Sequence, residues 1–271
     1  MKAGEFISSK TLKNISCLVL FSVLLVLLQI EKYEILTLWA AIALFMFFIV
    51  EKSGKLFIIT NILFGLGFLI YLFAKDYEVP GVVSSEMDIF LNRFSLIFIL
   101  IPLFIYSLYI KAPFINYFKR PEWNEIIMFP FIWSGFHQVK IKVFLAIALL
   151  INIAVMSPFM IINGWNAIME ILWFAIIFSF TNAILEELIW RGVLLSRFTE
   201  QLGEKWAVMI TSFGFGLQHY SLGFPWSICI GFAFGGFFYG VVTIKSKSIL
   251  PAIIWHIVLN FLMVFSGLFG N

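Results

Sequence analysis

The sequence predicts an all-α fold, a polytopic bundle of transmembrane helices with its N-terminus in the cytoplasm. Of the 271 residues, 62% are hydrophobic and only 12% are charged, whereas a soluble domain carries about 25% charged residues. The mean hydropathy is +1.03, and 34 phenylalanines would coat a water-soluble fold with apolar side chains. The apolar residues also fall in runs that approach the length of about 20 residues needed to cross a bilayer.

Nine apolar runs separated by polar segments are the candidate spans. They cover 14–30, 34–50, 56–74, 89–110, 143–163, 169–196, 206–222, 225–244 and 249–269. The first run follows three lysines but ends without a small-residue cleavage site, so we expect a retained anchor rather than a signal peptide. Because the turns near 31–33 and 223–224 are brief, eight spans is the alternative.

The charges of the loops agree with nine spans. Positive residues concentrate in alternate loops, and cytoplasmic loops carry an excess of Lys and Arg. The segments predicted on the same side of the membrane as the N-terminus hold Lys2, Lys10, Lys13, Lys52, Lys55, Lys111, Lys119, Arg120, Lys140, Lys142, Arg197, Lys205, Lys245 and Lys247. The opposite loops hold Lys32 and Lys75, and Arg93 and Arg191 fall within spans. We therefore expect a multi-pass protein of a cell membrane, and the Ile-, Phe- and Lys-rich composition favours a bacterial plasma membrane.

The mixed segment 111–142 divides the chain into two parts. It contains prolines and basic residues, and we expect a loop with an aromatic-rich interfacial stretch around Ile126–Phe136. Residues 1–142 are interpreted as a membrane scaffold of about four helices plus this loop. Residues 143–271 are interpreted as the C-terminal catalytic half, because nearly all ionisable groups at membrane depth lie there.

Six such polar residues stand out in the second half, and intramembrane ionisable residues are functional candidates by default. They are Glu186, Glu187, Arg191, His219, His256 and Asn260. The pairs Glu187–Arg191 and His256–Asn260 are four residues apart, so each pair shares a helix face. Glu186 lies about 100° round the helix from Glu187, which predicts that the two carboxylates point in different directions.

Helical rise places four of these groups at one level. Measured from the nearest cytoplasmic Lys or Arg at about 1.5 Å per residue, Glu186, His219, His256 and Asn260 lie about 14 to 21 Å deep. A polar cluster at mid-membrane is therefore predicted, in a cavity that we expect to open toward the cytoplasm.

The chemistry of such a cluster favours hydrolysis. Glu186 facing a histidine can act as general base toward a water, and Asn260 offers a neutral donor for a developing oxyanion. His256 could donate beside Asn260 or orient the water, and Glu187 with Arg191 forms a structural pair. The plain alternatives are a core role for His219, an interhelical hydrogen bond for Asn260 and close helix packing for the glycines of 225–244.

Three motifs at these residues resemble a known family. They are EELIWR at 186–191 (EExxxR), FGLQH at 215–219 (FxxxH) and HIVLN at 256–260 (HxxxN). The region around 170–265 resembles the CPBP intramembrane peptidases, which include type II CAAX prenyl proteases and the Abi bacteriocin-processing and immunity proteins. The resemblance implies that Glu186 activates water with His219 as its partner, and that His256 and Asn260 stabilise the oxyanion. Glu187, Arg191 and Phe215 would support the site.

A zinc site is the alternative to a metal-free mechanism, with Glu186, His219 and His256 as ligands. A catalytic zinc needs three protein ligands and a separate base, which would leave only Glu187, and the sequence has no HExxH pairing. We therefore expect no required cofactor.

The predicted function is an intramembrane endopeptidase. The alternatives are a non-catalytic immunity or partner-binding membrane protein and a proton-coupled transporter. The expected partners are the lipid bilayer and a peptide or membrane-protein substrate, prenylated or not, and no nucleic acid. The sequence leaves the oligomeric state open.

Overall fold

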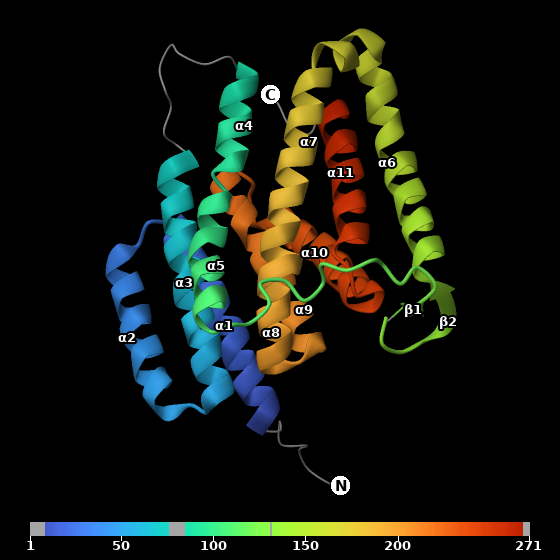
Figure 1. Ribbon diagram of the computed structural model, residues 1–271. Coiled ribbons are helices and arrows are strands. Elements are labelled where there is room, and N and C mark those ends of the chain that lie inside the picture. Colours follow the sequence, from blue (N-terminus) through green and yellow to red (C-terminus); the bar gives the residue numbers. More distant parts are fainter. Residues whose placement is uncertain (1–8, 76–84, 131, 268–271) are drawn as a thin grey trace, which may run out of the picture.

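The structure is a computed structural model that describes residues 9–75, 85–130 and 132–267 (Figure 1). Helices occupy all nine predicted apolar runs, so the predicted all-α polytopic bundle is confirmed. Within the described residues, six helices are long and apolar enough to cross a membrane. Three further helices, described below, have 15 to 17 residues, and the choice between eight and nine spans depends on them.

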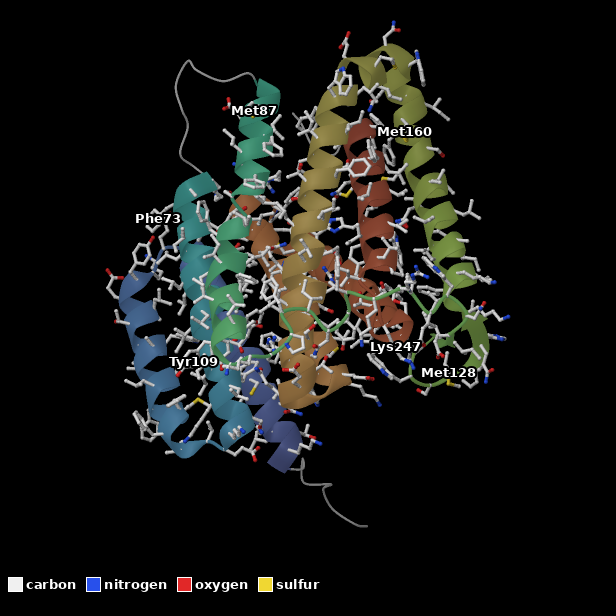
Figure 2. The ribbon with its side chains drawn as sticks, in the orientation of Figure 1. Phe73, Met87, Tyr109, Met128, Met160 and Lys247 are labelled. Atoms are coloured by element: carbon white, nitrogen blue, oxygen red, sulfur yellow. The ribbon has the colours of Figure 1, made fainter. Side chains whose placement is uncertain are left out.

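The N-terminal helices are α1 (Ser9–Gln29), α2 (Tyr33–Ile49) and α3 (Lys52–Lys75). In Figure 1, α2 lies at one edge of the bundle, and its apolar side chains such as Phe45 and Phe48 are largely exposed. Apolar side chains also cover the outside elsewhere, as Phe73 and Tyr109 show in Figure 2. Such a surface suits contact with lipid rather than water.

The predicted span 89–110 is divided into α4 (Ser85–Phe94) and α5 (Ile97–Tyr109). At the break, the N–H of Leu96 donates to the carbonyl of Arg93, three residues back instead of four. The hydroxyl of Ser95 donates to the carbonyl of Asn92, and such local bonds compete with regular helix. The break places Arg93 at the end of α4, inside the bundle.

The segment predicted as an interfacial loop contains a β-hairpin. Strand β1 (Ile126–Pro130) pairs antiparallel with β2 (Gly135–Lys140), with Ile126 opposite Lys140. The loop interpretation of 126–136 was wrong here, because β-branched and aromatic residues separated by a short turn favour local strand pairing. Ile127 is buried and Phe136 is 87% exposed. The hairpin lies at the end of the bundle that holds Lys247 (Figure 2).

The longest stretch of helix begins with α6 (Ile141–Glu170), which bends at Gly164, where φ is 79°. It is followed by α7 (Leu172–Glu187), the π-helical segment η1 (Leu188–Leu194) and α8 (Leu195–Leu202). These last three form one continuous rod through the middle of the bundle (Figure 1). By contrast α6 is largely exposed and packs against the last helix of the chain.

The last elements are α9 (Glu204–Gln218), the short 3₁₀-helix η2 (His219–Leu222), α10 (Trp226–Ser246) and α11 (Leu250–Phe265). Helices α9 and α10 pack closely at Gly216, where an added Cβ would lie 2.4 Å from the carbonyl oxygen of Cys229. The glycines of α10 divide into two pairs. Gly236 and Gly240 pack against neighbouring atoms as expected, whereas a Cβ at Gly231 or Gly235 would meet nothing within 4 Å.

A cluster of aromatic side chains joins the two predicted parts of the chain. Phe21 of α1 and Phe64 of α3 lie 6.2 and 5.6 Å from the ring of Trp190 in η1, and all three are buried. The indole N–H of Trp190 donates to Gln218 at 3.0 Å. The scaffold helices therefore pack directly behind the EELIWR segment, and the boundary at residue 142 stays a prediction.

The approach of α9 to α10 gives a prediction on stability. We expect Gly216→Ala to lower the free energy of unfolding by about 1–3 kcal/mol, because the new methyl overlaps the backbone of α10. Gly231→Ala is the matched control and should change it little, because its Cβ meets open space. Unfolding in detergent micelles followed by circular dichroism measures both variants. Equal stabilities would contradict this account of the helix contact.

Candidate active site

Glu186 and Glu187 end α7, directly before the π-helical segment η1. A π-helix places more residues in each turn than an α-helix and occurs often at functional sites. Glu186 is 1% exposed and Glu187 is fully buried. The chain thus places two adjacent carboxylates inside the bundle at a change of helical pitch.

His256 of α11 lies between the two carboxylates. Its Nδ1 is 2.8 Å from Oε1 of Glu187, and its Nε2 is 3.7 Å from Oε2 of Glu186. Sequence reasoning assigned Glu187 to Arg191 alone, because the carboxylates were expected to point apart. One imidazole contacts both carboxylates because its two nitrogens lie on different edges of the ring.

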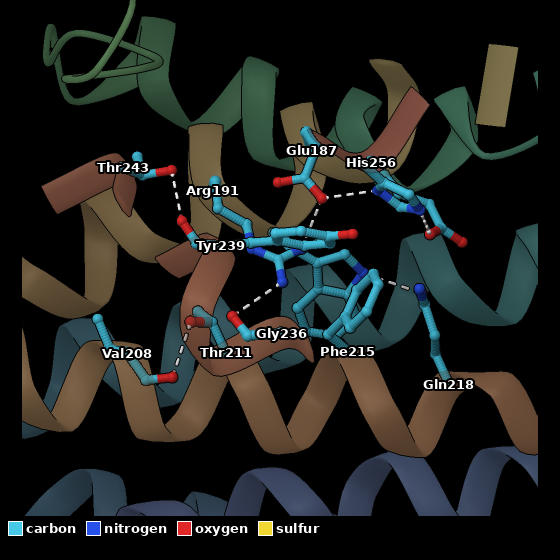
Figure 3. Close-up of polar contacts among 12 residues, drawn as sticks. Glu187, Arg191, Val208, Thr211, Phe215, Gln218, Gly236, Tyr239, Thr243 and His256 are labelled. Atoms are coloured by element: carbon cyan, nitrogen blue, oxygen red, sulfur yellow. Dashed lines mark hydrogen bonds and ion pairs between the residues drawn. The ribbon is translucent and has the colours of Figure 1, made fainter. Parts of the chain in front are cut away.

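Arg191 is fully buried and is held by several groups at once (Figure 3). Its Nη1 donates to Glu187 at 2.9 Å and its Nη2 donates to the carbonyl of Gly236 at 3.0 Å. The guanidinium carbon also lies 4.3 Å from the ring of Phe215 and 5.1 Å from the ring of Tyr239. The predicted pair Glu187–Arg191 is present, and Phe215 supports it as a cation–π partner.

Tyr239 is a site residue that sequence reasoning missed. Its ring is nearly parallel to that of His256, with centroids 5.3 Å apart. The buried hydroxyl has no hydrogen-bond partner within the described part of the chain. The sequence offered one indication of this role, because Tyr239 lies three residues after Gly236 on a glycine-rich helix. Periodicity alone, however, does not reveal which helix faces α10.

His219 begins η2, where α9 ends. Its Nδ1 lies 2.7 Å from the carbonyl oxygen of Phe215. Since a carbonyl only accepts, Nδ1 carries a proton, and in a neutral imidazole this leaves Nε2 as the acceptor. The ring stacks on Phe232 with centroids 4.0 Å apart. His219 is thus oriented with one nitrogen available as an acceptor.

A cavity of about 90 Å³ joins these groups. Its polar wall contains His219, His256 and Asn260, together with Arg93 and Asn182. Asn260 is 3% exposed and its Nδ2 has no hydrogen-bond partner among the described residues. Glu186 is not part of the wall and lies beside it, next to His256. Three of the four predicted catalytic residues therefore line one cavity, and the fourth lies behind it.

One end of the cavity lies near the ends of two helical segments. Its wall reaches Leu222 at the end of η2 and Met263 near the end of α11. At that end, Nζ of Lys75 donates to the carbonyl of Ser221. The side of the membrane toward which the cavity opens stays a prediction.

A metal fits this arrangement poorly. No group of three or more His, Cys, Asp or Glu side chains that could hold a metal ion occurs within residues 9–75, 85–130 and 132–267. The alternative ligand set of Glu186, His219 and His256 thus does not converge on one point. His256 directs its two nitrogens toward the two carboxylates.

A bundle of apolar helices around a buried cluster of glutamate and histidine defines a multi-pass membrane protein with an enclosed polar site. Residues 167–262 match the family model described as type II CAAX prenyl endopeptidase Rce1-like. The resemblance predicted from the three motifs is therefore confirmed over that range. Neither the curated proteins nor the solved structures give a match.

The buried ion pair gives a second prediction. We expect Glu187→Gln to lower the free energy of unfolding by about 3–5 kcal/mol, because it leaves the buried cation of Arg191 without a counter-charge. The double variant Glu187→Leu with Arg191→Leu should lose less than the sum of the losses of the single variants Glu187→Leu and Arg191→Leu. Unfolding in detergent measures the cycle.

Glu122→Gln is the control for this cycle, because it breaks the exposed pair with Lys247. Exposed pairs contribute about 1 kcal/mol or less. Additive losses at 187 and 191, or a control as damaging as Glu187→Gln, would contradict the assigned role of the buried pair.

Proposed function

We propose that the protein is an intramembrane endopeptidase that hydrolyses a peptide bond with a glutamate-activated water. The observation that carries the proposal is His256, held between two buried carboxylates at the wall of a cavity that His219 and Asn260 also line. The match to a protease family over the same residues supports it. A peptide or membrane-protein substrate would reach the site within the bilayer.

Glu186 is the proposed base rather than Glu187. Oε1 of Glu187 already accepts from Arg191 and from His256, so this oxygen is occupied by other partners. Glu186 has only the longer contact to His256, and its Oε2 has no hydrogen-bond partner among the described residues. An unpartnered carboxylate oxygen next to the cavity is suited to accept a proton from water.

The other groups then take distinct roles. With Nδ1 held by a carbonyl, His219 can accept a hydrogen bond from the water through Nε2 and orient it. As the water attacks the carbonyl carbon, its proton passes to Glu186, and the free Nδ2 of Asn260 donates to the oxygen that gains charge. Protonated Glu186 then returns the proton to the leaving amine, which breaks the C–N bond. His256 lies between the two carboxylates and stabilises their negative charge.

The test compares membrane-peptide profiles by mass spectrometry in cells that express the wild type or Glu186→Gln at matched levels. Gln preserves the shape and removes the base, so we expect peptides that only the wild type produces. Glu170→Gln, at the exposed end of α6, is the matched control and should keep the wild-type profile. Identical profiles for wild type and Glu186→Gln across several growth conditions would favour a non-catalytic immunity or partner-binding role.

Metal dependence is tested on the purified protein. We expect cleavage of an identified peptide to persist after dialysis against a chelator, because the proposed base and oxyanion donor act without a metal. Addition of zinc should not increase the rate. Activity that is abolished by the chelator and restored by zinc would replace this mechanism by the zinc alternative.

A further inference from the structure

Arg93 differs from the other buried arginines of the described chain. Arg191 pairs with Glu187 and Arg197 pairs with Glu200, but no carboxylate of the described residues lies within 4.0 Å of Arg93. Its hydrogen-bond partners among the described residues are amide oxygens, with Nη1 3.3 Å from Oδ1 of Asn182 and Nε 3.0 Å from Oδ1 of Asn92. A guanidinium that is only 8% exposed is therefore held by neutral groups.

The position of Arg93 brings this cation into the site. It lies at the end of α4, outside the segment that matches the protease family, and it lines the cavity with His219 and Asn260. Its partner Asn182 is one helical turn before Glu186 on the same rod, so the two side chains are neighbours on one face. A residue of the N-terminal half thus completes the cavity wall.

The cavity wall contains the positive charge of Arg93 and therefore favours an anionic ligand. Apart from Arg93, the described residues that line the cavity are apolar, amide, imidazole, phenol or glycine, and none is a carboxylate. A guanidinium has five N–H donors arranged as a fork that fits a carboxylate, and the two amide partners of Arg93 leave some of these donors unpaired. The carboxylate of Glu186 acts on Arg93 electrostatically, but it lies outside the cavity wall and makes no ion pair with Arg93 within 4.0 Å. A carboxylate that enters the cavity can therefore pair directly with the guanidinium.

We propose that Arg93 binds a carboxylate of the substrate peptide, either its C-terminal carboxylate or an acidic side chain next to the cleaved bond. Apolar groups beside Arg93, including Phe178 and Met263, would contact the rest of that segment. The carboxylate would pair with the free N–H groups of Arg93 while the neighbouring peptide bond lies near His219 and Glu186. This inference rests on the proposed function for its consequence in catalysis, but the binding step can be measured without cleavage.

The experiment uses the full-length protein with Glu186→Gln in detergent, so that binding is read without turnover. A pool of short acetylated apolar peptides is offered as free acids and as C-terminal amides, with a third set that carries an internal glutamate and an amide end. Bound peptides are recovered by ultrafiltration and quantified by mass spectrometry. We expect free acids, glutamate peptides or both to bind at least about tenfold more tightly than neutral amides, which is about 1.4 kcal/mol.

Adding Arg93→Gln should abolish this preference. Arg93→Lys keeps the charge and should keep part of the preference, which covers the case in which the Gln variant does not fold. Arg120→Gln, an exposed arginine outside the cavity, is the matched control and should keep the preference in full. Whichever acidic set binds better identifies the source of the carboxylate.

The proposal is overturned if acids bind no more tightly than amides, including the case in which neither binds. It is also overturned if the preference survives Arg93→Gln. Failure of the proposed catalytic function gives a different pattern, because wild type and Glu186→Gln would then show the same peptide profiles in cells while the preference for acids persists in the binding assay.

Discussion

The buried ion pair of Glu187 and Arg191 is the constraint on which the arrangement of the site depends. Both side chains are fully buried, and the cost of removing two charges from water is offset only if their remaining donors and acceptors are also satisfied. Gly236 supplies a carbonyl, while Phe215 and Tyr239 supply ring faces. These partners come from α9 and α10, so one pair fixes three segments of the bundle relative to each other.

The same pair determines the state of the catalytic candidates. Glu187 pairs with Arg191 and accepts from Nδ1 of His256, which directs Nε2 toward Glu186. Gly236 leaves room for this arrangement, because a Cβ there would lie 3.2 Å from Nη2 of Arg191 and 3.0 Å from the ring of Phe215. Glu187, which does not line the cavity, thus determines which ring nitrogen of His256 lies toward Glu186. The different roles proposed for the two adjacent glutamates follow from this contact.

The predictions from the sequence were most accurate where they relied on the length of the apolar runs. Every predicted span contains helix, because an apolar run in a bilayer must satisfy its backbone hydrogen bonds internally. Motif spacing also placed His219, His256 and Asn260 on one cavity. What it missed depends on angles between helices. The π-helical turn after Glu187 and the stacking of Tyr239 on His256 both require knowledge of how α7, α10 and α11 face one another.

The N-terminal half also contributes more than an anchor. Phe21 and Phe64 pack on Trp190, one residue before Arg191, so α1 and α3 support the helix that presents the ion pair. On the other side of the rod, the break between α4 and α5 brings Arg93 to Asn182. A polar side chain inside a bilayer needs a protein environment on every side. Helices from outside the matched segment provide that environment here.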